Sequence, residues 1–207
     1  MTAAVVHTPY PESDRRIVRA ALIMCEALAE DPLWGPWVAS ANPFQHASIR
    51  LLTVTYMAEA VRAGWLRLSP DLGGVMCWVG PGSKGPSLVE RMAERALAPC
   101  ALGRDRQAVL SLFHEMSAVR ADLPPHVYAV FLGVLPESRQ RGVGSSLAAE
   151  GLSWAAMNRV PVYLEAFTES NKDLYERAGF MVVRRFSAPR GVTGYGMLRN
   201  VGSTVAR

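Results

Sequence analysis

The sequence has no apolar run of about 20 residues, which is the length that a membrane-spanning helix needs. It also lacks a signal-peptide-like apolar stretch near its start, so we expect a cytoplasmic protein with no membrane partner. Cysteine is rare, and Cys25, Cys77 and Cys100 are too scattered for a disulfide framework or a zinc site. The four histidines show no metal-ligand spacing, so no metal site is predicted.

A strong excess of charge is also absent. The net charge is +4, and the arginines are spread along the chain instead of forming a basic tail, so a nucleic-acid partner is not expected. Half of the 207 residues are apolar and 19% are charged, which is typical of a soluble globular protein. A chain of this length buries a sizeable core, and we expect a single domain over residues 1–207.

The pattern of apolar residues predicts an α/β protein. The first part, residues 1–125, is mainly helical, whereas residues 126–200 alternate strands and helices in the manner of a mixed sheet with helices on both faces. Helices are expected over residues 14–29, with Ser13 as the cap, over 43–63, over 88–119 with a break near 99–103, over 145–158 and over 171–178. Strands are expected over residues 65–68, 74–79, 126–135, 160–166, 180–186 and 194–199.

A glycine-rich turn between a predicted strand and a predicted helix is the clearest candidate for a binding site. A turn that opens a helix presents backbone amides without intrahelical partners, and glycine lets an anion approach them closely. The turn therefore suits a phosphate or pyrophosphate, although a glycine turn with solvated arginines would show the same pattern. Its residues are Arg139, Gln140, Arg141, Gly142, Val143, Gly144 and Ser145.

Two other phosphate motifs fit the turn poorly. The Gly-x-x-x-x-Gly-Lys motif of nucleotide-binding P-loops is absent. A dinucleotide-binding fingerprint needs a small residue where Leu147 stands, and its glycines should follow the strand directly.

Residues 130–180 resemble the GCN5-related N-acetyltransferase (GNAT) family. The resemblance rests on the strand ending Gly133-Val134-Leu135-Pro136, on the turn from Arg139 to Gly144, and on the segment from Asn171 through Tyr175 to Phe180. Tyr163-Leu164-Glu165, the segment Leu174–Phe180 and, loosely, Cys77–Pro81 make the chain similar to the puromycin N-acetyltransferase-like branch.

The resemblance implies a GNAT-like domain that uses acetyl-CoA, with residues 126–200 binding the cofactor and residues 1–125 forming the acceptor side. It implies that the pantetheine arm lies along Leu132, Gly133 and Val134 and bonds Asn171. It places the pyrophosphate on the amides from Gln140 to Ser145, and Tyr175 near the sulfur. Family members are often monomers or homodimers.

The chemistry of acetyl transfer requires an uncharged amine, but a free alkylamine has a pKa of about 10 and is mostly protonated at neutral pH. Glu165, near the end of a predicted strand, is the candidate base; the alternative is a structural carboxylate paired with an arginine. Tyr175 is suited to protonating the departing thiolate, and Asn171 is equally suited to capping a helix.

The acceptor is expected to be a primary amine of a small molecule, and the resemblance suggests an aminonucleoside or another drug-like amine. Trp34 and Asp31 are the candidate acceptor-binding residues, since an aromatic ring and a carboxylate both suit an organic ammonium. Three alternatives stay open: acetylation of a protein N-terminus or lysine, a CoA-binding regulatory module without catalysis, and a dinucleotide-dependent enzyme, which Leu147 disfavours.

Overall fold

The structure, a computed structural model, describes the backbone of residues 10–40 and 42–202 and the side chains from Arg15 onward within these ranges. Its α-helices are α1 (Tyr10–Ala27), α2 (Gly35–Val38), α3 (Pro43–Arg62), α4 (Leu88–Leu102), α5 (Arg106–Asp122), α6 (Val143–Met157) and α7 (Glu169–Arg177). Its strands are β1 (Leu66–Leu68), β2 (Gly74–Val79), β3 (Val127–Val134), β4 (Val162–Ala166), β5 (Met181–Ser187) and β6 (Thr193–Arg199). Short 3₁₀ turns are η1 (Gly103–Asp105), η2 (Pro136–Ser138) and η3 (Pro189–Gly191).

The strands form one mixed sheet in the order β1-β2-β3-β4-β6-β5. The central pair β3 and β4 is parallel, and the other neighbours are antiparallel. This arrangement confirms the predicted α/β fold with a mixed sheet. Strands β1 and β2 lie in residues 1–125, the part predicted to be mainly helical, and β3 to β6 lie in residues 126–200. Both parts of the chain therefore contribute strands to the sheet.

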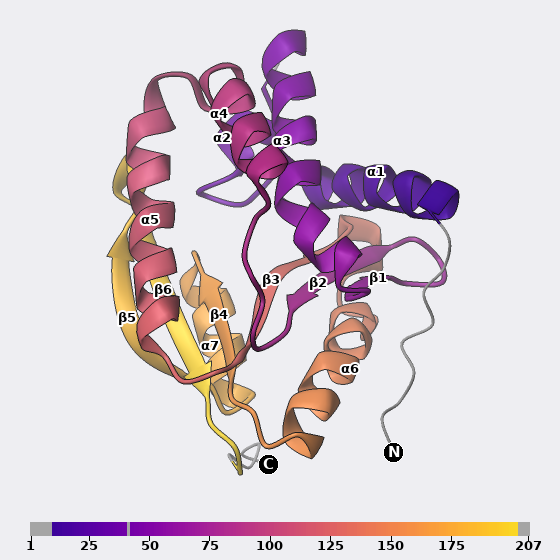
Figure 1. The fold of residues 1–207 in the computed structure, drawn as a ribbon, viewed down its shortest axis with the longest axis vertical. Helices are drawn as coiled ribbons and strands as arrows, with labels where there is room; N and C mark the ends of the chain where they lie inside the picture. Colours follow the sequence, from indigo (N-terminus) through magenta and orange to yellow (C-terminus); the bar gives the residue numbers. More distant parts are fainter. Residues whose placement is uncertain (1–9, 41, 203–207) are drawn as a thin grey trace.

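The sheet opens at its centre. Strand β3 pairs with β4 only through its first three residues, Val127 to Ala129, which face Val162 to Leu164. Beyond Ala129 the two strands diverge (Figure 1), while the other edge of β3 stays paired with β2 as far as Val134. The edge of β3 that faces β4 is therefore open from Val130 to Val134, and backbone polar groups there are available to a ligand.

Helices cover both faces of the sheet, as predicted. Helix α6 packs against β2 so closely that a Cβ atom on Gly151 would lie 2.3 Å from the Trp78 ring. On the opposite face α1 crosses β3, and a Cβ atom on Gly133 would lie 2.7 Å from the Met24 sulfur. Figure 1 shows α3 and α4 gathered at the end of the molecule away from α6, with α5 running beside β5. Residues of α3, α4 and α5 line the same cavity as residues of β3.

The predicted elements are confirmed in type, and their bounds differ at several ends. Helix α1 begins at Tyr10 instead of at a Ser13 cap, and the Ser13 side chain lies outside the described residues. The predicted break near residues 99–103 is confirmed at its C-terminal end: α4 continues through Pro99 and ends before Gly103, whose φ of 54° is unfavourable for other residues. The short helix α2 follows the predicted break after α1 and was not expected.

No helix in residues 10–40 and 42–202 combines the length and apolar character required to cross a bilayer.

Candidate active site

A cavity of about 1200 Å³ lies above the open edge of β3. One wall, called here the cradle wall, consists of β3, the turn before α6, and α7. The other, called here the acceptor wall, consists of the end of α1 and parts of α3, α4 and α5. The cavity therefore brings together residues from both parts of the chain.

The glycine turn lies on the first of these walls and is the candidate anion cradle. Gly142 precedes α6 with φ of 79°, a conformation that glycine adopts without strain, and a Cβ atom there would meet nothing within 4 Å. The first helical hydrogen bond of α6 runs from the Ser146 amide to the Gly142 carbonyl, 2.9 Å away. The amides of Val143, Gly144 and Ser145 come before it and have no helical acceptor. These amides, at the positive end of the helix dipole, fit a phosphate group.

The cradle continues onto the open strand edge. Leu132, Gly133 and Val134 line the cavity together with Gln140 and the first turn of α6. A Cβ atom on Gly144 would stand 3.4 Å from the Val134 side chain and 3.8 Å from that of Leu132. The turn and the strand edge thus form one continuous surface, as required for a ligand that carries both a phosphate and an extended arm. The residues present fit such a ligand.

The two arginines of the turn have different environments. The Arg139 guanidinium bonds the Glu30 carboxylate at 2.7 Å and the carbonyl oxygens of Ala27 and Val134, at 3.2 and 3.3 Å. It therefore ties the turn to the end of α1. Arg141 is exposed and is absent from the cavity lining, so the structure does not bring it to the cradle.

Helix α7 brings Asn171 and Tyr175 to the cavity. Its N-cap is Thr168, whose hydroxyl accepts the Asn171 amide at 3.1 Å, so the interpretation of Asn171 as the capping residue is wrong. The Asn171 side chain is exposed on the cavity wall, where it remains available to a ligand. Tyr175 packs edge-on against Phe180, with ring centroids 5.7 Å apart, and burial raises the pKa of its phenol.

Glu165 is buried near the end of β4. Its Oε1 accepts a hydrogen bond from Arg120 at 2.8 Å, and its side chain is 3% exposed. Burial raises the pKa of Glu165, and the Arg120 charge and the Tyr128 hydroxyl act in the opposite direction. Arg120 lies over the Tyr128 ring, 4.4 Å from its centroid. The arginine partner was not identified from the sequence, because the pair depends on how α5 packs on the sheet.

The predicted acceptor residues lie on the opposite wall. Residue Trp34 is 7% exposed, and its ring contacts the rings of Tyr56, Phe113 and Phe131, at centroid distances of 5.9 to 6.3 Å. Asp31 accepts the amides of Leu33 and Trp34, both at 2.9 Å, so one of its oxygens stabilises the local turn. Both residues line the cavity.

Carboxylates that the sequence analysis missed also face the cavity, namely Glu59 on α3 and Glu94 on α4. Glu94 accepts a hydrogen bond from the Tyr56 hydroxyl at 3.0 Å. Burial raises the pKa of Glu59. An acidic residue on an otherwise apolar helical stretch, Met57 to Ala60, was the only sequence signal for Glu59.

Within the part of the chain that the structure describes, no group of three or more His, Cys, Asp or Glu side chains is arranged to hold a metal ion.

Comparisons with known proteins come from a family model and from solved structures. Residues 107–180 match the model of the Acetyltransferase (GNAT) family. An acetyltransferase of Corynebacterium glutamicum, described as histone acetyltransferase HPA2 and related acetyltransferase, is 20% identical, with a TM-score of 0.62 over 96% of this chain and 97% of that one.

Two further solved structures carry names that refer to small amines. Arylalkylamine N-acetyltransferase 2 of Aedes aegypti is 11% identical, with a TM-score of 0.61 over 95% of this chain and 98% of that one. A polyamine N-acetyltransferase of Drosophila melanogaster that forms N-acetylagmatine is 16% identical, with a TM-score of 0.54 over 89% of this chain and 96% of that one. At these identities the similarity shows a shared fold.

Proposed function

We propose that this protein is an acetyltransferase of the GNAT family and that it transfers an acetyl group from acetyl-CoA to a primary amine of a small molecule. The observation that carries the proposal is that one cavity is lined both by the glycine turn and by the aromatic and acidic side chains of the acceptor wall. Such a cavity admits donor and acceptor together, so one complex can hold both. The continuous sheet supports a single catalytic domain over residues 1–207.

Acetyl-CoA, as co-substrate, would lie along the cradle wall. In this proposal the amides of Gln140 to Ser145 hold the pyrophosphate, and Arg139, which lines the same cavity, adds positive charge beside them. The backbone from Leu132 to Val134 pairs with the pantetheine arm as an added strand would, and Asn171 bonds the same arm. The open edge of β3 and the exposed Asn171 side chain support this placement.

Direct attack of the amine on the acetyl group is the proposed reaction. The amine nitrogen bonds the carbonyl carbon, the carbon–sulfur bond breaks, and the amine proton passes to Glu165 directly or through water. Tyr175 then donates a hydrogen bond or a proton to the departing thiolate, and its raised pKa keeps the phenol protonated for this role. None of the three cysteines lines the cavity, which supports direct attack over a covalent acetyl-cysteine.

The acceptor side favours small organic amines. Trp34 and its aromatic neighbours offer an apolar surface, and Asp31 adds a negative charge beside it. The proteins of similar fold that are named for agmatine and arylalkylamine acetylation add support for an amine of this size. The resemblance to the puromycin N-acetyltransferase-like branch places puromycin among the amines to be tested.

The test is CoA thiol release from acetyl-CoA with a panel of primary amines, using the wild-type protein and Tyr175→Phe. We expect amine-dependent release by the wild type. In Tyr175→Phe we expect kcat to fall by about tenfold to a hundredfold with an unchanged affinity for acetyl-CoA, because only the leaving thiolate loses a proton donor. Absence of release with every amine would contradict the function, and normal turnover in the variant would remove the role of Tyr175.

A further inference from the structure

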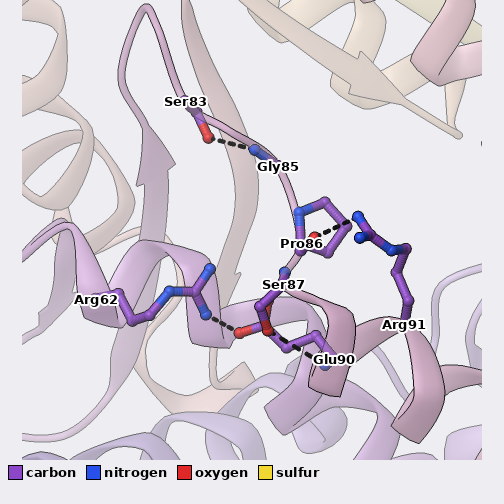
Figure 2. Close-up of polar contacts among 7 residues, drawn as sticks. All are labelled: Arg62, Ser83, Gly85, Pro86, Ser87, Glu90 and Arg91. Atoms are coloured by element: carbon purple, nitrogen blue, oxygen red, sulfur yellow. Dashed lines mark hydrogen bonds and ion pairs between the residues drawn. The ribbon is translucent and has the colours of Figure 1, made fainter.

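The cavity has two parts of different character, and the part at α3 and α4 carries charged side chains. Figure 2 shows Glu90 bonded to Arg62 and, through its other oxygen, to the Ser87 amide at 2.6 Å. Arg91 bonds the Pro86 carbonyl at 2.7 Å, in the loop that precedes α4 (Figure 2). Glu90 and Arg91 both line the cavity, so this part suits a polar acceptor better than an apolar chain.

The second part of the cavity lies between the sheet and α6 and is apolar. Its sheet side is a row of directly paired residues, Trp78 on β2, Ala129 on β3 and Leu164 on β4. Paired residues point to the same face of a sheet, and this is the face that α6 covers, because the Trp78 ring packs on Gly151. This part, called here the inner pocket, is lined by Trp78, Ala129, Ala148, Leu152, Leu164 and Phe180.

The inner pocket continues the line of the open strand edge. In the proposed complex the pantetheine arm runs along this edge from Val134 toward Val130. Ala129 comes next, and from Ala129 back to Val127 the same edge of β3 is paired with β4. The inner pocket therefore offers a ligand apolar contacts in place of the hydrogen bonds of an open strand edge. The part of the donor that extends beyond the arm is the acyl chain, which requires only such contacts.

The candidate base lies on the other face of the sheet. Successive residues of a strand point to opposite faces, so Glu165 points away from the face that carries Leu164. Arg120 of α5 bonds Glu165 there, at 2.8 Å. An amine that gives its proton to Glu165 therefore approaches from the face away from the inner pocket, and an acyl chain in the pocket leaves this approach free.

We propose that the inner pocket holds the acyl chain of the donor and accommodates chains longer than acetyl, so that propionyl-CoA and butyryl-CoA are also donors. This inference rests on the proposed acetyl transfer and specifies the class of donor. The small side chains of Ala129 and Ala148 leave space that larger residues would fill. The transfer step is unchanged: the amine nitrogen bonds the acyl carbonyl carbon, the carbon–sulfur bond breaks, and the CoA thiol leaves.

The experiment is calorimetric titration with acetyl-, propionyl-, butyryl- and hexanoyl-CoA, without acceptor, of the wild type, Leu152→Trp and Leu152→Ala. We expect the affinity of the wild type to rise about fourfold for each methylene added, and about fifteenfold from acetyl to butyryl, the value for burying apolar groups. Leu152→Trp fills the inner pocket and should lose this gain. Leu152→Ala enlarges the pocket and should raise the affinity for hexanoyl-CoA relative to butyryl-CoA.

Ala149→Trp is the matched control, because it places the same large side chain on α6 at an exposed position outside the cavity. Its ratio of butyryl-CoA to acetyl-CoA affinity should equal that of the wild type. Each ratio is taken within one variant, so a loss of folded protein does not affect it. An unchanged ratio in Leu152→Trp would overturn the assignment of the acyl chain to the inner pocket.

Equal affinity of the wild type for acetyl-CoA and butyryl-CoA would overturn the inference while leaving acetyl transfer intact. Absence of binding for every acyl-CoA would contradict the proposed donor site and the inference together. Mass spectrometry of the product provides a second readout. With an amine that the wild type acetylates, butyryl-CoA should yield the N-butyryl product, and the absence of this product would contradict transfer of the longer chain.

Discussion

Replacing Glu165 by glutamine is expected to lower kcat for amine acetylation by about a hundredfold to ten-thousandfold, the contribution of a general base. The substitution keeps the size and the hydrogen-bonding capacity of the side chain but removes its ability to take a proton. Acetyl-CoA affinity should be unchanged, because Glu165 lies on β4, away from the anion cradle. Steady-state kinetics by thiol release measures kcat, and calorimetry measures the affinity.

The pH profile separates a base from a structural carboxylate at this position. Burial raises the pKa of Glu165, so the deprotonated form that accepts a proton accumulates only above the ordinary range for a glutamate. We expect kcat of the wild type to rise with pH through that raised pKa, and Glu165→Gln to lack this rise. Glu150→Gln, which breaks the exposed ion pair with Arg67, is the control and should retain it. An identical profile in Glu165→Gln and the wild type would show that Glu165 only pairs with Arg120.

Gly144→Val is expected to weaken acetyl-CoA binding by about tenfold to a hundredfold, which corresponds to losing a hydrogen bond to a charged group. A Cβ atom at this position would stand 3.4 Å from the Val134 side chain, an ordinary contact that the fold accommodates. The additional methyl groups of valine would fill the space between α6 and the open edge of β3. Calorimetric titration with acetyl-CoA measures the loss.

Two variants calibrate the Gly144 result. Gly144→Ala adds only the tolerated Cβ atom and should bind acetyl-CoA more tightly than Gly144→Val. Ser146→Val introduces the same side chain in the same turn, but Ser146 does not line the cavity, so its affinity should match that of the wild type. Wild-type affinity in Gly144→Val would mean that the cradle lies elsewhere.

The order and type of the main elements could be predicted because their signals are local. Strand β2 matches its predicted bounds, residues 74–79, since a continuous apolar run there is bounded by turn residues. The position of the glycine turn before α6 was also predictable, because Gly142 and Gly144 stand between a strand and a helix and their conformational freedom depends on the residue type itself; anion binding there stays a prediction. Helix ends were less well predicted. Proline favours a helix end because it lacks a backbone N–H donor, yet α4 continues through Pro99 to Leu102, since its other hydrogen bonds and its packing outweigh that one lost donor.

The partners of the charged residues could not be predicted from local patterns. Arg120 and Glu165 are separated by 45 residues and meet only because α5 packs beside the open sheet. Arg139 pairs with Glu30, 109 residues away, whereas Arg141 two positions later is exposed and outside the cavity. Glu59 could not be distinguished from a solvated helical glutamate until α3 was placed against the cavity. Such pairings are decided by tertiary packing, which brings together side chains that are distant in sequence.

Calorimetric titration of the wild-type protein with acetyl-CoA, with NADH and ATP as controls, tests the central claim most directly. The claim is that the glycine turn and the open edge of β3 hold acetyl-CoA. The account predicts saturable binding of acetyl-CoA and no comparable binding of NADH or ATP, because the strand edge recognises the pantetheine arm that both controls lack. The absence of acetyl-CoA binding, or equal binding of all three compounds, would contradict the account.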